Sequence, residues 1–224
     1  MKIQLRHIAL PVVFAGVLMA WGGPGYKNAE QLSVTEKSIP VSTPDSTLKE
    51  GDLIFQSSSS GQGLAIQMAT GSKYNHVGML YKKNGKLMVL EAMQPIKITA
   101  LESFISRGDN KHYVVKRLKE NVLNDSILTL MHKEADKHVG KNYDLYFGWD
   151  DSLIYCSELV WKIYDRTLGI QVGTLQKLKD FDLSNPIVQY KLAERFGDDI
   201  PYEENVISPA RIFESDKLAT VLEK

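Results

Sequence analysis

The chain has 224 residues, 43% hydrophobic and 24% charged, which is typical of a globular protein with one domain of ordinary size. Lysine and arginine together number 27, equal to aspartate and glutamate together, so the sequence lacks the basic excess usual in nucleic-acid-binding proteins. The chain contains one cysteine, which excludes an intramolecular disulfide.

Residues 1–22 have the three parts of a secretory signal peptide. Lys2 and Arg6 give a positive start, an uncharged apolar run follows at 8–20, and small residues come next. The run is shorter than the about 20 residues that a bilayer-spanning helix needs, which favours a cleaved signal over an uncleaved N-terminal anchor. We therefore expect an exported protein, periplasmic or extracellular, without a stable membrane span after signal removal.

Residues 23–49 are predicted to form a polar linker or arm, because Gly, Pro, Ser and Thr recur there. Residues 50–224 are predicted to form the folded domain. Its first elements are a short strand at 52–56, a serine-rich loop, and a short helix at 64–69. Gly61-Gln62-Gly63 is predicted to be a flexible turn, since a lone Gly-x-Gly is weak support for a phosphate-binding loop.

A β-hairpin is the strongest local signal in the sequence. Two apolar runs, 76–81 and 87–92, flank Asn84-Gly85, a pair that favours a tight hairpin turn. Side chains alternate along a strand, so counting outward from the turn places His76 and Glu91 on one face. They are expected to be diagonal neighbours, about 7–8 Å apart between positions.

The later elements are predicted from hydrophobic spacing and capping residues. We expect a short helix at 99–108 with Thr99 and Glu102 as a capping box, a strand at 112–118, and amphipathic helices at 126–139 and 155–168. The tail from Leu183 is predicted to be irregular apart from a helix start at Ser208-Pro209. Early strands flanked by helices indicate an α+β fold.

Cys156 falls in or near the first turn of the helix predicted at 155–168, with capping residues expected from 150–152. Unpaired N–H groups at a helix start stabilise a thiolate, the reactive form of cysteine. The alternative is a small buried hydrophobic residue, because Cys156 shares a helix face with Val160 and Ile163. A lone thiol in an exported protein is either buried and inert or kept for its reactivity.

A thiol nucleophile needs a histidine within hydrogen-bonding reach. His132 and His138 are six residues apart on a predicted helix, so both are expected at the solvated surface, and His112 is expected to be exposed at a sheet edge. His76 is favoured, because Glu91 can fix its tautomer as the third member of a triad does. The alternative is an ordinary surface ion pair between His76 and Glu91.

Taken with these residues, the sequence resembles the permuted papain-like amidases of the YaeF/YiiX type, relatives of the NlpC-like cell-wall peptidases. The resemblance runs from about residue 50 to the end and rests chiefly on SKYNHVGM at 72–79 and YCSELV at 155–160. It implies a circularly permuted papain-like fold: an antiparallel sheet or half-barrel packed against helices, with the nucleophile at a helix N-terminus.

The resemblance also implies a triad of Cys156, His76 and Glu91, the same three residues that the hairpin count selects. Relatives carry a tyrosine near the nucleophile in a Gly-x-x-Tyr segment, which corresponds to Tyr143. Tyr143 and Tyr155 are therefore candidates for binding the substrate or the oxyanion.

From these residues we expect an exported cysteine hydrolase, an amidase or peptidase, acting on a small peptide, acyl or cell-wall substrate. One alternative is an acyltransferase or lipid (thio)esterase that uses the same thioester chemistry. Another is a catalytically inactive wall-binding module. The sequence has no metal-ligand spacing, so we expect no metal, and we expect no cofactor. The balanced charge gives no reason to expect a nucleic-acid partner.

Overall fold

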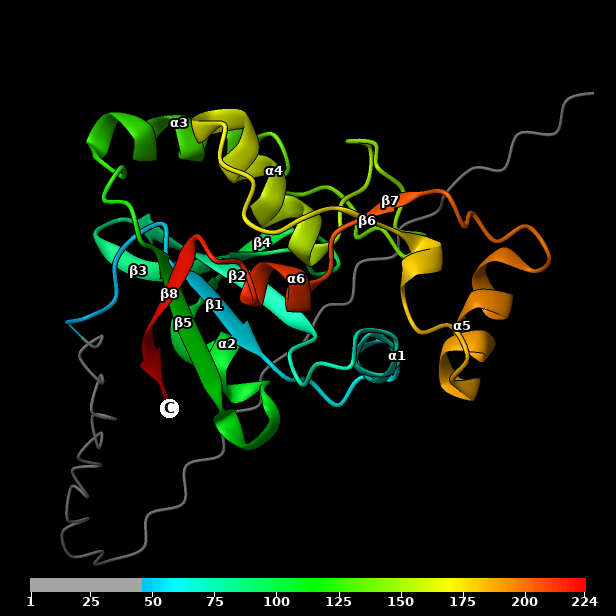
Figure 1. Cartoon of the computed structure of the whole chain (residues 1–224). Helices are drawn as coiled ribbons and strands as arrows, with labels where there is room; N and C mark the ends of the chain where they lie inside the picture. Colours follow the sequence, from blue (N-terminus) through cyan, green and yellow to red (C-terminus); the bar gives the residue numbers. More distant parts are fainter. Residues whose placement is uncertain (1–45) are drawn as a thin grey trace, which may run out of the picture. The chain divides into compact units, whose positions relative to one another are not determined.

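A computed structural model of the protein describes residues 46–224 (Figure 1). The predicted signal peptide at 1–22 and most of the predicted arm at 23–49 lie outside the described residues. The last residues of that arm pack on the domain, because Leu48 is buried and the Lys49 N–H donates to Asp52 Oδ2 at 2.8 Å. Within the described part, no helix has the length and apolarity needed to cross a membrane.

A six-stranded antiparallel sheet, in the order β4-β3-β2-β1-β5-β8, forms the centre of the domain. Its strands are β1 (Leu53–Gln56), β2 (His76–Lys83), β3 (Lys86–Glu91), β4 (Lys97–Ala100), β5 (Tyr113–Leu118) and β8 (Leu218–Glu223). A second sheet pairs β6 (Gln176–Lys177) with β7 (Asn205–Val206). The helices are α1 (Gly61–Thr70), α2 (Leu101–Ser106), α3 (Asp125–Asp136), α4 (Cys156–Leu168), α5 (Pro186–Phe196) and α6 (Pro209–Phe213).

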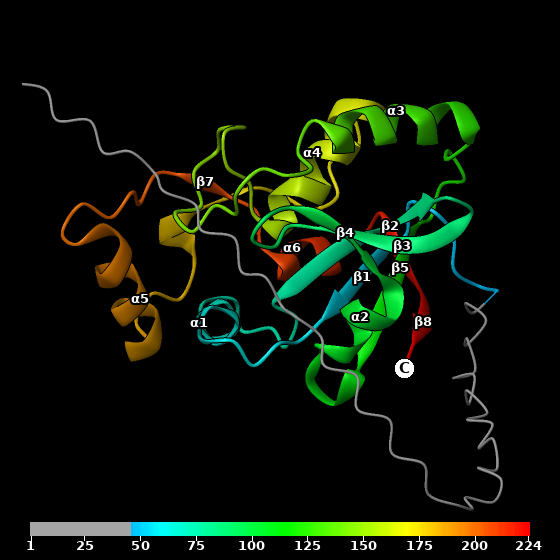
Figure 2. The same cartoon turned by 180° about the vertical axis from the view of Figure 1, so that it is seen from behind.

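Helices lie on both faces of the sheet (Figures 1 and 2), and buried side chains form one hydrophobic core on each face. On one face, Leu159 and Ile163 of α4 are fully buried with α3 packed alongside. On the other face, Phe104 of α2 packs on Leu80 and Val89, which point away from α4 because side chains alternate along a strand. The expected antiparallel sheet packed against helices is confirmed.

The β2–β3 hairpin has the predicted register. Asn84 and Gly85 have φ of 51° and 75°, and Lys83 pairs with Lys86. Both turn residues therefore adopt the left-handed conformation that a tight hairpin turn requires, which Asn and Gly tolerate best.

Two local predictions about helix starts were wrong. Gly61-Gln62-Gly63 is not a flexible turn but the start of α1, because Ser60 caps the helix by accepting the Gly63 N–H at 3.0 Å. Thr99 belongs to β4, so α2 begins only at Leu101 and has no side-chain cap. Pairing of β4 with β3 outweighs the local capping signal.

The tail after Leu183 is more regular than predicted. It contains α5, which starts at the Asn185 cap with Pro186 in its first turn, and β8, which pairs with β5. The predicted helix start at Ser208-Pro209 is present as the start of α6. Because β8 covers β5, His112 is half-buried rather than exposed at a free edge.

Candidate active site

Cys156 is the first residue of α4, and Tyr155 is the N-cap residue. The segment Asp150–Ser152 does not cap the helix as predicted; the Tyr155 N–H donates instead to Glu158 Oε2 at 3.3 Å. The Cys156 side chain is buried, and its sulfur accepts backbone N–H groups from Val77 and Ser157. Donors from both the helix start and the neighbouring strand therefore stabilise negative charge on the sulfur.

His76 and Glu91 meet across the hairpin, as their diagonal positions predict. His76 Nε2 lies 2.7 Å from Glu91 Oε2, and the imidazole also hydrogen-bonds with the Cys156 thiol. Because Nε2 is occupied by Glu91, Nδ1 is the ring nitrogen left for the sulfur. Glu91 is fully buried, and its other oxygen accepts a hydrogen bond from the Arg107 guanidinium.

Helix α2 supplies two site residues that the sequence analysis missed. The ring of Phe104 stacks on His76 with centroids 5.5 Å apart, and Arg107 follows the last turn of the helix. An added Cβ at Gly78 would lie 2.5 Å from Val89 Cγ1 and 3.4 Å from Phe104, so glycine permits this close packing. No local pattern identifies Phe104 or Arg107, because their contacts with the hairpin depend on how α2 packs.

Opposed pKa shifts characterise the pair of Cys156 and His76. Burial alone would lower the pKa of His76, but hydrogen bonds with Cys156 and Glu91 outweigh it and raise that pKa to about 9. Burial alone would raise the pKa of Cys156, but the hydrogen bond and charge of His76 outweigh it and lower that pKa. Glu91 keeps a lowered pKa despite its burial, because His76 and Arg107 stabilise the carboxylate. The arrangement therefore favours a thiolate beside an imidazolium.

The two candidate tyrosines are placed differently. The Tyr143 hydroxyl hydrogen-bonds with Cys156, and burial together with the charge of Cys156 raises its pKa well above 10, so it stays protonated. The Tyr155 hydroxyl instead accepts the Ile207 N–H at 3.1 Å, and its buried ring packs edge-on against Phe147. Tyr143 thus reaches the sulfur with its hydroxyl, whereas Tyr155 presents only its ring to the site.

Two pockets meet at the catalytic centre. One is apolar and lies between α1, α5 and the start of α4, with Cys156 in its wall. The other, called the polar pocket below, has more polar side chains in its wall, although much of its lining is apolar; they include His76, Arg107, Ser58, Ser59, Ser60, Asn75 and Gln94. Gln62 and Tyr143 line both pockets, so a bound molecule can extend to either side of the sulfur.

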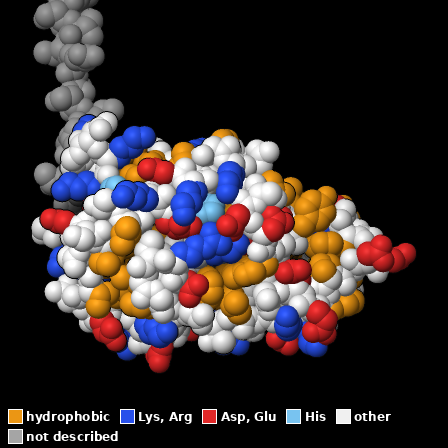
Figure 3. Space-filling view, turned by 90° about the horizontal axis from the view of Figure 1, so that it is seen from above, with side chains coloured by type: hydrophobic (Ala, Val, Ile, Leu, Met, Phe, Trp, Pro, Cys, Tyr) orange, Lys and Arg blue, Asp and Glu red, His pale blue; other side chains and the backbone are white. Residues whose placement is uncertain are grey.

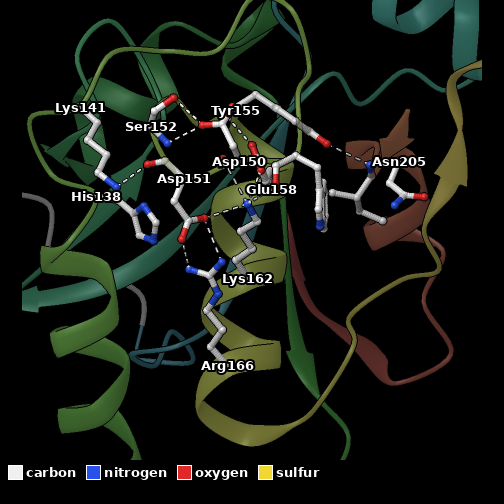
Figure 4. A network of polar contacts seen from close by, with 12 residues as sticks. His138, Lys141, Asp150, Asp151, Ser152, Tyr155, Glu158, Lys162, Arg166 and Asn205 are labelled. Carbon is white, nitrogen blue, oxygen red and sulfur yellow. Dashed lines mark hydrogen bonds and ion pairs between the residues drawn. The ribbon is translucent and has the colours of Figure 1, made fainter. Parts of the chain in front are cut away.

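A network of ionic contacts on α4 holds the segment that precedes the nucleophile (Figure 4); it is buried at Glu158 and Lys162 and reaches solvent at Asp151 and Arg166. Lys162 Nζ lies 2.6 Å from Glu158 Oε1 and 2.9 Å from Asp151 Oδ1. Arg166 bonds Asp151 and also Glu134 of α3. These contacts join α3, α4 and the loop before Cys156.

His132 and His138 were both predicted at the solvated surface. His132 is partly exposed, hydrogen-bonds with Glu50 at 2.6 Å and stacks on Tyr81. For His138 the prediction was wrong: its side chain is 1% exposed, and neither ring nitrogen has a hydrogen-bond partner. His138 follows the C-terminal end of α3, a helix that packs on α4, and its side chain is buried next to Glu134.

The family model for the permuted papain-like amidase enzymes, YaeF/YiiX, C92 family, matches residues 47–222. The chain belongs to this family. The uncharacterized protein YiiX of Escherichia coli strain K12 is 48% identical over 171 residues, which cover 76% of this chain and 84% of YiiX. A solved structure, described as metalloprotein yiiX from Escherichia coli O157:H7, is 47% identical, with a TM-score of 0.76, over 80% of this chain and 98% of its own.

Membership of the C92 family confirms the predicted resemblance and the circularly permuted papain-like fold. It also supports an amidase-type cysteine hydrolase activity in general terms.

The description of the solved relative as a metalloprotein raises the question of a metal at this site. Cys156, His76 and Glu91 are metal-ligating residue types, but each Glu91 oxygen already accepts a hydrogen bond, one of them from the cationic Arg107. Across residues 46–224, no three His, Cys, Asp or Glu side chains are grouped to hold a metal ion. The described residues therefore do not fit a metal centre.

Proposed function

We propose that this C92 protein is an exported cysteine amidase or peptidase with Cys156 as nucleophile, His76 as base and Glu91 as the residue that orients His76. The observation that carries the proposal is the hydrogen-bonded line from Glu91 through His76 to Cys156, with two pockets at its end. A thiolate held beside an imidazolium is the reactive form of a cysteine hydrolase.

In the first half-reaction, the Cys156 thiolate attacks the amide carbonyl carbon. The imidazolium of His76 gives its proton to the departing amine, and the acyl group stays on sulfur as a thioester. Water, deprotonated by the now neutral His76, then attacks the thioester, which releases the acid and restores the thiolate beside the imidazolium. Backbone N–H groups at the α4 start and the Tyr143 hydroxyl stabilise the oxyanion in both steps.

The pockets suggest which side of the substrate lies where. His76 protonates the leaving amine and lines the polar pocket, whereas Cys156 lies in the wall of the apolar one. The amine part therefore binds on the polar side and the acyl part on the apolar side. This apolar wall favours the second candidate function, an acyltransferase or lipid (thio)esterase with the same thioester, alongside hydrolysis of cell-wall peptides.

The rate of Cys156 alkylation by iodoacetamide, measured against pH, tests the proposed pair. In the wild type we expect a high rate near pH 6, and in His76→Ala we expect the low-pH reactivity to disappear. Cys156→Ala is the control, since it removes the chain's one cysteine and must abolish labelling. A thiol that titrates near its ordinary pKa of about 8.5 in both proteins would instead support the inactive binding module.

Export has a separate test. Production of the full chain in a bacterium, followed by fractionation and N-terminal sequencing, should give a mature periplasmic or secreted protein cleaved after Ala20 or Gly22. A full-length chain retained in the membrane would point to an uncleaved anchor.

A further inference from the structure

Gln62 links the two helices that border the apolar pocket. It lies in the first turn of α1, and its Oε1 accepts a hydrogen bond from Arg195 Nη2 of α5 at 3.3 Å. Its Nε2 lies 3.1 Å from the Tyr143 hydroxyl oxygen, and Tyr143 in turn contacts Cys156. A continuous polar chain therefore runs from Arg195 to the sulfur.

The chemistry of Arg195 fixes the orientation of the Gln62 amide. A guanidinium has five N–H donors and no acceptor, so the atom that faces it must be the amide oxygen. The amide nitrogen then faces Tyr143 and can only donate to the hydroxyl oxygen. Arg195 itself is half-buried, with its guanidinium carbon 5.3 Å from the centre of the Phe147 ring.

The direction of the Tyr143 hydroxyl follows from the direction of the amide. The phenol oxygen accepts the Gln62 proton, so its own O–H proton must point to another acceptor. Cys156 is the group that the hydroxyl contacts, and a thiolate or a developing oxyanion is a strong acceptor. The amide thus prevents the hydroxyl from turning its proton away from the reacting atoms.

We propose that Gln62, oriented by Arg195, is a positioning residue that directs the Tyr143 proton toward Cys156 and the oxyanion. This inference rests on the proposed function, because it assigns Gln62 a role in the same reaction. Preorganised donors stabilise developing charge best when they need no rearrangement during the reaction. Gln62 acts only through Tyr143, so its effect must vanish when the Tyr143 hydroxyl is absent.

A double-mutant cycle on the apparent pKa of the Cys156 thiol isolates this effect without a known substrate. The four proteins are the wild type, Gln62→Glu, Tyr143→Phe and the double variant, each titrated by iodoacetamide alkylation. The introduced carboxylate has nearly the shape of the amide but only accepts, so it draws the Tyr143 proton away from sulfur. We expect Gln62→Glu alone and Tyr143→Phe alone each to raise the thiol pKa by about one unit, as loss of one hydrogen bond to a charged group would.

The Tyr143→Phe background separates an effect that passes through the Tyr143 hydroxyl from direct repulsion between the introduced carboxylate and the Cys156 thiolate. In that background we expect Gln62→Glu to raise the thiol pKa by only a small fraction of its effect in the wild type. An equal rise in both backgrounds, or no rise in either, would overturn the inference. A wild-type thiol that is not acid-shifted would instead overturn the proposed function, so the two failures are distinguishable.

Gln62→Met provides the same cycle without an added charge if Gln62→Glu fails to fold, which thermal unfolding will reveal. Methionine keeps the length of the side chain but cannot donate to Tyr143, which frees the hydroxyl to rotate. We expect a smaller rise in the thiol pKa that again disappears in the Tyr143→Phe background. A rise in the thiol pKa that persists in the Tyr143→Phe background would show that Gln62 does not act through Tyr143.

Discussion

Two groups of buried charges lie on α4, and they differ in what surrounds them. At the first residue, Cys156 faces His76 and two pockets open beside it. Farther along, Glu158 and Lys162 face each other at 2.6 Å, and neither lines those pockets. Toward solvent, acidic and basic side chains are intermixed on the face seen from above (Figure 3).

The pKa shifts of the two groups have different causes. Burial raises the pKa of Glu158 to about 8, although the Lys162 ammonium is close by, so desolvation dominates there. At the catalytic pair, partner interactions overcome burial and move both pKa values toward the charged forms. A perturbed pKa therefore marks a reactive site only when a specific partner causes it and a cavity gives access.

Lys162→Met should produce the largest effect, a loss in the free energy of unfolding without a change in the reactivity of Cys156. Because the folded pKa of Glu158 is raised, its contribution to stability is present below pH 4.5 and is lost as pH rises through about 8. Without Lys162, the buried carboxylate has lost its cation, and we expect a loss of about 3–5 kcal/mol in the free energy of unfolding at pH 9. Urea unfolding at pH 6 and pH 9 measures it, with a smaller loss expected at pH 6.

The double variant Lys162→Met/Glu158→Gln is the matched control for that experiment. It removes the ionisable carboxylate, so most of the additional loss at pH 9 should be recovered. The alkylation profile of Cys156 should stay within a few tenths of a pH unit of wild type in both variants. A shift of one unit or more would mean that the two groups of charges are not independent.

Glu91→Gln should produce the next largest effect, on reactivity. The amide removes the negative charge that holds the His76 imidazolium, so the pKa of His76 falls and that of the thiol rises. We expect the thiol pKa from alkylation to rise by about 1–2 units, which corresponds to about 1.4–2.7 kcal/mol. Glu158→Gln makes the same chemical change in the other group and should leave the thiol pKa unchanged. Equal shifts in both variants would mean that the two groups do not differ in their effect on Cys156.

His138→Leu should have the smallest effect at neutral pH. Its ring is enclosed without hydrogen-bond partners, and burial together with the charge of Lys141 lowers its pKa. A group with a lowered folded pKa loses stability as pH falls through its ordinary value of 6.5, so the wild type should lose stability there and the variant should not.

Urea unfolding at pH 7.5 and pH 5 checks this. We expect a difference within about 1 kcal/mol at pH 7.5, because leucine fills similar space, and a clear advantage for the variant at pH 5. A loss above about 2 kcal/mol at pH 7.5 would indicate a hydrogen bond to His138.

The sequence predicted those parts of the site that depend on short-range geometry. Asn84-Gly85 set the hairpin register, and this register brought His76 and Glu91 together across two strands. The position of Cys156 at a helix start was also correct, although the cap is Tyr155 rather than 150–152. Periodicity and turn chemistry are local properties of the sequence, so they predict the hairpin register and the helix start without knowledge of the fold.

Features that depend on long-range packing were missed. Arg107 reaches Glu91 only because α2 lies across the hairpin, and Gln62 reaches Tyr143 over 81 positions of sequence. Two of the missed features are local instead: Asn185-Pro186 is a typical helix start and begins α5, and Ser60 caps the start of α1. The burial of His138 needed the packing of α3 on α4, which no local pattern encodes.

The order of the catalytic pieces along the chain has a consequence for biosynthesis. The hairpin with His76 and Glu91 leaves the ribosome well before Cys156. Hairpins form in about 1–10 μs, whereas translation adds about 5–20 residues per second, so the base and its orienting residue can pair seconds before the nucleophile exists. A nascent chain that ends before α4 therefore carries no thiol at all, and Cys156 becomes acidic only when α4 docks on the finished hairpin.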